Sequence, residues 1–562
     1  MFTRFSYCFR KYPLFRTFLW SCVIIVALAV SIIVNIRMTL VPELELVEPS
    51  IGSPGDVIFL RGQHFGTLRN NGFVEIGGER LTASSYLAWS DTEIKLLLPS
   101  NVQEGLVIVD ISGRRSQPKV FTNENTIPVA VPQTLLSKKP SIDSFSANSL
   151  GVGQLLVISG SNFGEIRKDS KVLFKVEREL RDSEEFRISA DSSEFIEGNV
   201  DDFDYESWSD KEIKVRIPDG AVSGNVFVQT EKGRSSPKNL KIVSCGAKQY
   251  FNDKTYLVRV KTDISNVAAT SASSFTLHIP RPELSATQPV IEMTECMPKP
   301  LLENYHNSVI QHAEFRSVKE EPLEFKQDFM IKVFEISCRI NREQVRPFSD
   351  RQRPLFVEYT KPNVYEPSDN PEIVRLGAAI VKKERNPYVQ ANLVYNYLLK
   401  NFTLLQFNRN GDFNFEQVSA EKAADSYDFA IMFTSILRSL KIPAKTLSGV
   451  LVDAELKTRS HWWNEFYIEN FGWVPVDLAL ANGLEYNSFH AVENKKEYYF
   501  GNLDSQHIMF SSGWDIVKPS LTNSKIVYRP RSYSLQNIWE EASAETDSYS
   551  SFWNVPEVLG LY

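Results

Sequence analysis

Hydrophobic and polar residues alternate along most of the chain between residues 47 and 345, in short runs bounded by glycine or proline. The runs Thr255–Val260 (TYLVRV) and Phe329–Ile336 (FMIKVFEI) are examples. A period of two predicts half-buried β-strands, because successive side chains of a strand point to opposite faces of the sheet. We therefore expect this part of the chain to be all-β, with residues 246–345 forming a β-rich domain of their own.

Two stretches of the β-rich part repeat one pattern at the same internal spacing. The segment GDVIFLRGQHFG at 55–66 matches GQLLVISGSNFG at 153–164, and WSDTEIKLLLP at 89–99 matches WSDKEIKVRIP at 208–218. Glycine permits turn conformations that are closed to other residues. We expect two equivalent antiparallel sandwiches with matching glycine turns at Gly62 and Gly160, and with Trp89 and Trp208 in matching positions.

These blocks resemble the IPT/TIG family of immunoglobulin-like domains over residues 47–122 and 139–243. The resemblance implies an immunoglobulin-like sandwich for each range. The second range also contains an acidic stretch from Asp182 to Glu206, for which we expect a solvated hairpin or loop. A calcium site is the alternative, although the D-x-[DN]-x-[DN]-G spacing of calcium loops does not occur there.

The hydrophobic period changes from two to three and four after residue 363. The residues Ile373, Leu376 and Ile380, and then Val389 and Leu393, are spaced as on one face of an amphipathic helix. A new domain with helices is therefore expected at 363–515, followed by a C-terminal extension at 516–562.

A longer helix is predicted shortly after residue 424. Its apolar face consists of Phe429, Phe433, Ile436, Leu437 and Leu440, and Pro443 stops the run. This prediction places Ser426 at the N-terminus of the helix. Either the Ser426 hydroxyl or the Asp425 carboxylate can cap the first turn, the latter together with Asp428 near position N3.

Two strands are predicted downstream of this helix. They contain HWWNEFYI at 461–468 and WVPVD at 473–477, and the turn ENFG joins them. A hairpin with this turn brings His461 and Asp477 within one or two residue pairs of each other.

The segments ADSYDFA (424–430), KIPAK (441–445), HWWNE (461–465) and GWVPVD (472–477) follow one another, and YFGNLD (499–504) comes after them. They resemble the transglutaminase-like superfamily of papain-related cysteine enzymes, whose motifs are G-x-C-x-[DE]-x-A, G-I-P-A-R, H-x-W-x-E and G-W-x-x-x-D. The resemblance implies an α+β papain-like domain with triad positions at Ser426, His461 and Asp477. In such enzymes a thiolate attacks an amide carbonyl beside an imidazolium, and the aspartate orients the histidine.

This chain departs from the family at the nucleophile, because Ser426 stands where the family has cysteine and Ala424 replaces the family's glycine. A thiol with a pKa near 8.5 can be shifted to form an ion pair with imidazole, whereas an aliphatic hydroxyl is too weak an acid. Ser426 is therefore interpreted as a helix cap or an inert remnant, and His461 as a structural residue oriented by Asp477. A serine triad is the alternative, and it needs general-base geometry and an oxyanion hole.

The N-terminal segment carries a separate signal. Residues 17–36 form a run without charged side chains. A helix of this length can span the hydrocarbon core of a bilayer, which is about 30 Å thick. Four of the five basic residues in the first 37 precede this run, so residues 1–16 are expected in the cytoplasm and the bulk of the chain outside it. We expect an uncleaved anchor in the cytoplasmic membrane; a signal peptide cleaved after Ala29 is the alternative.

Composition excludes several classes of function. The net charge is −7, of which the first 37 residues contribute +5, so the remainder carries −12 and no nucleic-acid partner is expected. Five cysteines in 562 residues do not make a disulfide scaffold. Because no CxxC or histidine-rich spacing occurs, neither a metal nor a cofactor is expected.

The leading hypothesis is a membrane-anchored, multidomain protein of the cell envelope in which all-β sandwiches precede a transglutaminase-like domain without thiol chemistry. Its cleft would hold a protein or peptide ligand without cleaving it. Two alternatives remain open: a hydrolase or acyl transferase that uses Ser426, His461 and Asp477, and a purely structural stalk.

Overall fold

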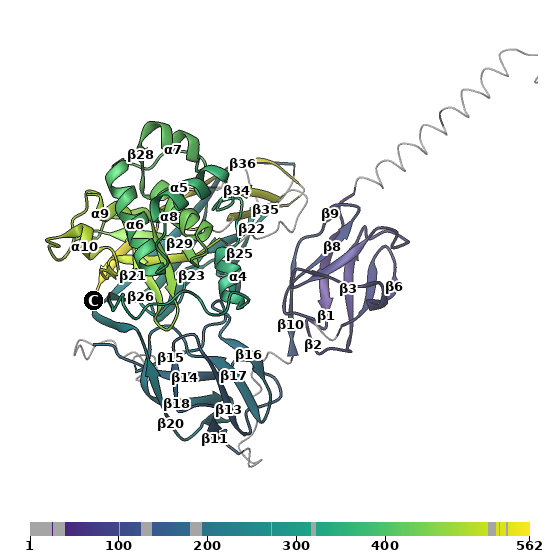
Figure 1. Cartoon of the computed structure of the whole chain (residues 1–562). Coiled ribbons are helices and arrows are strands. Elements are labelled where there is room, and N and C mark those ends of the chain that lie inside the picture. The colour runs from purple at the N-terminus through teal and green to yellow at the C-terminus, as the bar shows by residue number, and fades with distance from the viewer. Residues whose placement is uncertain are drawn as a thin grey trace, which may run out of the picture. The chain divides into compact units, whose positions relative to one another are not determined.

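The computed structural model describes residues 25, 40–99, 102–124, 138–179, 194–270, 273–315, 322–514, 524–527, 529–535, 538–543 and 545–562. The chain divides into two compact units, which are described separately below. One consists of residues 1–130 with 519–524 and 541–544, and the other contains the rest of the chain. The fold class is the predicted one, because β-strands dominate and the helices are concentrated after residue 353 (Figure 1).

The first unit contains a sandwich of two sheets around one buried core, to which Ile58, Val74 and Val107 belong. One sheet has the order β1-β3-β7-β6, and the other has the order β2-β10-β8-β4-β5 with β9 beside β8. The strands are β1 (Glu43–Glu48), β2 (Ile51–Gly52), β3 (Val57–Gln63), β4 (Phe73–Ile76), β5 (Glu79–Arg80), β6 (Tyr86–Trp89), β7 (Glu93–Leu97), β8 (Gly105–Ile111), β9 (Arg114–Arg115) and β10 (Lys119–Asn123). A single 3-10 turn, Ala83–Ser85, precedes β6.

The second sandwich has the same strand order, namely β11-β13-β17-β16 facing β12-β20-β18-β14-β15, with β19 beside β18. Its strands are β11 (Ser141–Phe145), β12 (Ser149–Gly151), β13 (Leu155–Ser161), β14 (Lys171–Val176), β15 (Phe195–Glu197), β16 (Tyr205–Trp208), β17 (Glu212–Arg216), β18 (Ala221–Thr230), β19 (Gly233–Arg234) and β20 (Lys238–Val243). In both sandwiches a parallel pair, β2 with β10 and β12 with β20, joins the second strand to the last.

The repeated tryptophans occupy equivalent positions. The indole Nε1 of Trp89 donates to the carbonyl of Phe65 at 3.0 Å, and that of Trp208 donates to the carbonyl of Phe163 at 3.1 Å. The repeated glycines, however, lie within strands β3 and β13 and not in turns. A Cβ at Gly62 would overlap the carbonyl of Glu43 on the neighbouring strand, so glycine is needed there for close approach of two backbones.

A third β domain consists of two sheets that combine distant parts of the sequence. The orders are β23-β26-β21-β36, with β37 beside β21 and β32 beside β26, and β24-β25-β22-β35-β34. The strands are β21 (Gly246–Ala269), β22 (Ser273–Pro280), β23 (Val290–Met297), β24 (Pro300–Tyr305), β25 (Ser308–Phe315), β26 (Leu323–Ile340), β32 (Asn502–Leu503), β34 (Ser524–Val527), β35 (Ile538–Ala542), β36 (Thr546–Trp553) and β37 (Glu557–Leu561). Strands from residues 524–561 thus complete the domain that begins at residue 246.

The α+β domain packs helices against an antiparallel sheet of order β31-β30-β29-β33. Its strands are β29 (Ala444–Val452), β30 (Thr458–Ile468), β31 (Gly472–Val476) and β33 (His507–Ser512), with a short parallel pair β27 (Thr403–Leu404) and β28 (Ala423–Ala424). The helices are α4 (Pro354–Thr360), α5 (Pro371–Val381), α6 (Pro387–Asn401), α7 (Phe415–Glu421), α8 (Ser426–Ser439), α9 (Leu478–Ala481) and α10 (Lys495–Tyr498). Helix α8 contacts β29 and β30 and packs with α5 and α6 (Figure 1).

Local sequence explains where these helices begin. Asn370 and Asn386 cap α5 and α6 with their side chains, and each is followed by a proline, which suits the first helical position. Helix α8 is buried more completely than a single apolar face implies, since every residue from Ser426 to Arg438 is buried. It is the central helix of the domain.

No helix in the described part of the chain is long and apolar enough to cross a membrane. Apart from Ile25, the expected anchor at residues 17–36 and the preceding residues 1–16 lie outside the described residues.

Candidate functional site

The N-terminus of α8 is capped by Asp425 and not by Ser426. The Asp425 carboxylate accepts from the backbone N–H of Asp428 at 2.9 Å, and the Asp428 carboxylate accepts from the backbone N–H of Asp425 at 3.3 Å. This reciprocal pair is a capping box, in which each side chain satisfies an end amide of the helix. Ser426 is therefore the first helical residue, and its hydroxyl is free of the capping role.

The Ser426 hydroxyl makes a long hydrogen bond of 3.5 Å to the Asn408 side-chain oxygen. Ser426 is only 2% exposed. Since α8 carries Ser426 on its first turn, the side chain lies at the positive end of the helix dipole, which is where the family places its thiol.

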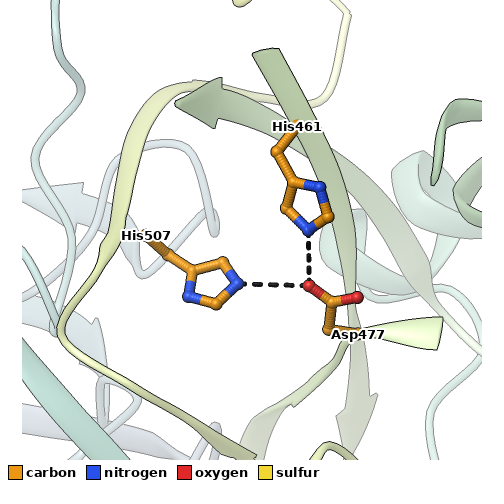
Figure 2. A group of neighbouring side chains, drawn as sticks. All are labelled: His461, Asp477 and His507. Carbon is orange, nitrogen blue, oxygen red and sulfur yellow. Dashed lines mark hydrogen bonds and ion pairs between the residues drawn. The ribbon is translucent and has the colours of Figure 1, made fainter. Parts of the chain in front are cut away.

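His461 and Asp477 form a buried pair, as the sequence predicted (Figure 2). Strands β30 and β31 pair in a register that puts Asn464 opposite Val476, so His461 and Asp477 emerge close together. His461 Nε2 lies 2.6 Å from Asp477 Oδ2. The other oxygen, Oδ1, accepts from the backbone N–H of Leu480 at 2.8 Å, which fixes the carboxylate at the start of α9.

A second histidine, which the sequence analysis did not identify, completes this network (Figure 2). His507 Nε2 lies 3.1 Å from the same oxygen of Asp477, and its Nδ1 lies 2.8 Å from Asp504 Oδ1. His507 begins β33, which pairs with β29 on the side opposite β30. The segment YFGNLD ends at Asp504 and is the only sequence signal near this histidine.

The protonation states follow from burial and from these contacts. Burial lowers the pKa of His461, although Asp477 opposes the shift. Burial also acts on His507, but Asp504 and Asp477 outweigh it and raise the pKa of His507 to about 10. The two histidines in turn hold the pKa of the buried Asp477 carboxyl below its ordinary value. At neutral pH the network is thus a neutral His461, an Asp477 anion and a His507 cation.

A neutral His461 that donates from Nε2 to Asp477 keeps a lone pair on Nδ1. Within the described residues, Nδ1 has no hydrogen-bond partner. His461 therefore has a free basic atom, but the Ser426 hydroxyl bonds to Asn408 and not to it.

The ligand atoms of His461, Asp477 and His507 all lie within 4.8 Å of one another, a spacing that fits a small divalent cation. Both Nε2 atoms, however, are already directed at one carboxylate oxygen at hydrogen-bond distances of 2.6 and 3.1 Å. A metal at this point would have to displace a proton of His507 and break both contacts to Asp477. The contacts are those of a hydrogen-bonded network, which satisfies these atoms without an ion.

A segment from the C-terminal part of the chain covers the start of α8. The Arg531 guanidinium donates to both oxygens of Asp425 at 2.7 and 2.6 Å and to Asp428 at 2.8 Å. Its carbon lies 4.5 Å from the ring centre of Tyr427. Arg531 was not a predicted site residue, because nothing near position 531 in the sequence indicates its distant partners.

Part of the acidic stretch of the second sandwich is buried, contrary to the expected solvated loop. Asp202 and Asp204 are 5% and 2% exposed, and Asp202 accepts from Trp473 Nε1 at 2.9 Å. Residues 182–193 lie outside the described residues. Cys245, Cys296 and Cys338 are free cysteines, so no disulfide links them.

Comparisons with known proteins agree with the two resemblances. Residues 374–478 match the family model of the transglutaminase-like superfamily, and residues 42–125 match that of the IPT/TIG domain. The chain therefore contains a transglutaminase-like domain and an IPT/TIG domain.

Individual relatives are distant. An uncharacterized protein of Haemophilus influenzae is 26% identical over 165 residues, which is 24% of this chain and 45% of that protein. A candidate cysteine protease from Cytophaga hutchinsonii has 14% identity and a TM-score of 0.35, covering 56% of this chain and 93% of that structure. The periplasmic domain of TgpA from Pseudomonas aeruginosa has 12% identity and a TM-score of 0.23, covering 40% and 86%. The chain spans less than half the length of the curated relatives that it matches.

Proposed function

We propose that this chain is a membrane-anchored, extracytoplasmic protein whose transglutaminase-like domain lacks acyl-transfer activity and serves as a binding or scaffolding module. Residues 17–36 provide the anchor, and the sandwiches hold the domain outside the cytoplasm. The proposal rests on the side chain at position 426. A hydroxyl replaces the thiol there, and it bonds to Asn408 at 3.5 Å and not to His461.

The charges around Ser426 support this proposal. In a cysteine enzyme of this type the histidine is protonated, and the resulting imidazolium stabilises the thiolate. Here burial disfavours the protonated form of His461, and the cationic His507 already compensates the Asp477 charge. The site therefore lacks both the ionisable nucleophile and the cation beside it.

A binding role is supported by what already lies on the site. Residues 529–535 of the chain run over the start of α8 and place Arg531 against Asp425 and Asp428. A surface that holds a segment of the chain itself has the shape and polarity for a peptide.

One observation favours a second candidate, a serine hydrolase or acyl transferase. His461 and Asp477 keep the 2.6 Å contact of a catalytic pair, and Nδ1 of His461 can accept a proton from Ser426 if the hydroxyl turns away from Asn408. This arrangement requires a neutral His461, which is the form that burial favours.

Activity measurements on the full chain separate the two candidates. Wild type, Ser426→Ala, Ser426→Cys, His461→Ala and the double variant Ser426→Cys, His461→Ala are incubated with glutamine-containing peptides and with a serine-directed phosphonate. Each is also prepared with Arg531→Ala, so that inactivity is not caused by the segment 529–535 alone. We expect no turnover by wild type and no labelling of Ser426 in either background.

Weak activity in Ser426→Cys that disappears with His461→Ala would agree with the proposal, because it restores only the missing thiol. Wild-type turnover, or labelling, that is abolished by both Ser426→Ala and His461→Ala would establish the serine enzyme instead.

A further inference from the structure

Strands β34 and β35 are neighbours in one sheet of the third β domain, and residues 529–535, which lie between them in the sequence, contact the transglutaminase-like domain. We call residues 529–535 the hairpin tip. The tip contacts two sides of the domain: the first turn of α8, and the strands β29 and β33. It therefore contacts both the helix that carries Ser426 and the sheet that carries His461.

The Arg531 side chain fills a socket that uses all of its donor groups. Nη1 donates to both oxygens of Asp425, Nη2 donates to Asp428 and to the carbonyl of Asp412 at 3.5 Å, and Nε donates to the carbonyl of Gly411 at 2.8 Å. Both carboxylate side chains are fully buried, and that of Arg531 is 7% exposed. A planar fork of five N–H groups matches this set of acceptors, and an ammonium group does not.

Arg409 is the other cation at the socket. Its backbone N–H donates to Asp425 Oδ2 at 2.7 Å, and its Nε lies 3.5 Å from Asp428 Oδ2. The guanidinium of Arg409 pairs more closely with Glu421, at 2.6 Å. Two buried carboxylates therefore depend on Arg531 for most of their charge compensation.

The remainder of the tip turns at residues 530–533, where the backbone N–H of Ser532 donates to the carbonyl of Arg529 at 3.2 Å, and binds through a buried side chain and its backbone. Leu535 is 2% exposed and packs in one apolar cluster with Tyr427, Ile431 and Trp462. Its backbone N–H donates to Ser511 Oγ at 3.1 Å, and the carbonyl of Tyr533 accepts from Ser448 Oγ at 3.2 Å. Arginine and leucine, four positions apart, are thus anchored by a charged and an apolar pocket.

We propose that this site recognises a peptide of a partner protein through an arginine followed four residues later by an aliphatic side chain, with the hairpin tip as the segment bound in cis. The inference rests on the proposed binding function and specifies its ligand. Because the tip is tethered, it competes at a high effective concentration, in the millimolar range for short flexible linkers. A peptide in trans therefore binds only when the tip is displaced.

The test uses the full chain with the double substitution Arg531→Ala and Leu535→Ala, which empties both pockets. The probe is a fluorescent peptide with the sequence of residues 530–535, PRSYSL, and the control peptide has lysine in place of its arginine. We expect the emptied variant to bind PRSYSL at least tenfold more tightly than wild type does, and at least tenfold more tightly than the lysine peptide.

A matched receptor variant adds Asp425→Asn, which keeps the helix cap because asparagine also caps well but removes one charge of the socket. It should lose at least tenfold in affinity for PRSYSL. Equal binding of the arginine and lysine peptides, or no binding to a folded emptied variant at millimolar peptide, would overturn the proposal.

If the emptied variant does not fold, wild type decides the question by hydrogen exchange. Millimolar PRSYSL should speed exchange in residues 529–535, and the lysine peptide should not. Unchanged exchange with PRSYSL would refute the inference. None of these outcomes alters the activity assays on Ser426, so a failed peptide experiment leaves the inactive-domain proposal standing.

Discussion

At position 426 a hydroxyl oxygen stands where the cysteine enzymes of the family have a thiol sulfur, and the nearby His461, Asp477 and His507 form a charge-balanced network. The Asp477 carboxylate contacts two histidines, at 2.6 and 3.1 Å, whereas the aspartate of a catalytic pair contacts one. His507 takes the positive charge and His461 remains neutral. His461, Asp477 and His507 therefore form a buried polar network, in which each side chain is a hydrogen-bond partner of another.

This network predicts a pH dependence of stability. The folded pKa of His507 is about 10, above an unfolded value of roughly 6.5, so its contribution is fully present below pH 6.5 and is lost as the pH rises through 10. The groups that face it are Asp504, Asp477 and His461. We expect wild type to lose at most roughly 5 kcal/mol of this stabilisation across that range, whereas His507→Gln loses none of it.

The measurement is the denaturant midpoint of the transglutaminase-like domain from pH 6 to 10 in wild type and His507→Gln. The exposed histidine variant His490→Gln is the control and should follow wild type. Parallel curves for wild type and His507→Gln would show that His507 does not titrate in this window.

At the scale of single elements, the sandwiches depend on backbone contact between strands. A Cβ on Gly62 of β3 would overlap the backbone carbonyl of Glu43 on β1, and one on Gly160 of β13 would overlap that of Ser141 on β11. Both glycines lie beside a register shift in the partner strand, where the ladder is locally irregular.

Replacing Gly62 by alanine should therefore destabilise the first sandwich by about 1–3 kcal/mol, since the added methyl group must push β1 away. Hydrogen exchange of the β1 and β3 amides in the full chain measures the effect. Arg61→Ala, an exposed neighbour on the same strand, should change it by less than about 0.5 kcal/mol. Equal exchange in Gly62→Ala and wild type would mean that β1 adapts freely.

On the scale of the whole molecule, the second sandwich and the transglutaminase-like domain share buried contacts within one compact unit. Trp473 Nε1 donates to Asp202 at 2.9 Å. The backbone carbonyl of Trp473 also accepts from Lys248 Nζ, on β21 of the third β domain, at 2.6 Å. Trp473 belongs to the GWVPVD motif, so the strand that leads to Asp477 is also the strand that meets the sandwich.

Asp202→Ala should lower the stability of this unit by about 1–3 kcal/mol, because it leaves a buried indole N–H without its acceptor. Asp202→Asn keeps a carbonyl acceptor and should lose less. Calorimetric unfolding of the full chain measures both variants, with Trp473→Phe completing a double-mutant cycle. Additive losses in the Asp202→Ala, Trp473→Phe double variant would contradict a direct coupling between the two side chains.

The sequence by itself determined the elements and the motif residues of this protein. Strand alternation, the repeated blocks and the asparagine–proline starts of α5 and α6 are local signals, and the hairpin spacing between His461 and Asp477 is short enough for the register to be predicted. These features depend on neighbours within about a dozen residues, which is the range over which periodicity and turn chemistry act.

Only the tertiary structure decided which residues surround Ser426. His507 reaches Asp477 because β33 pairs with β29, and Arg531 reaches Asp425 from a hairpin whose strands complete the sheet that begins with β22 at residue 273. Contacts between such distant segments produce no period or fixed spacing in the sequence. Many polar residues could supply the hydrogen-bond partner, so the sequence does not indicate which one does. The protonation of His461 and the contacts of Arg531 at the start of α8 follow from these long-range contacts.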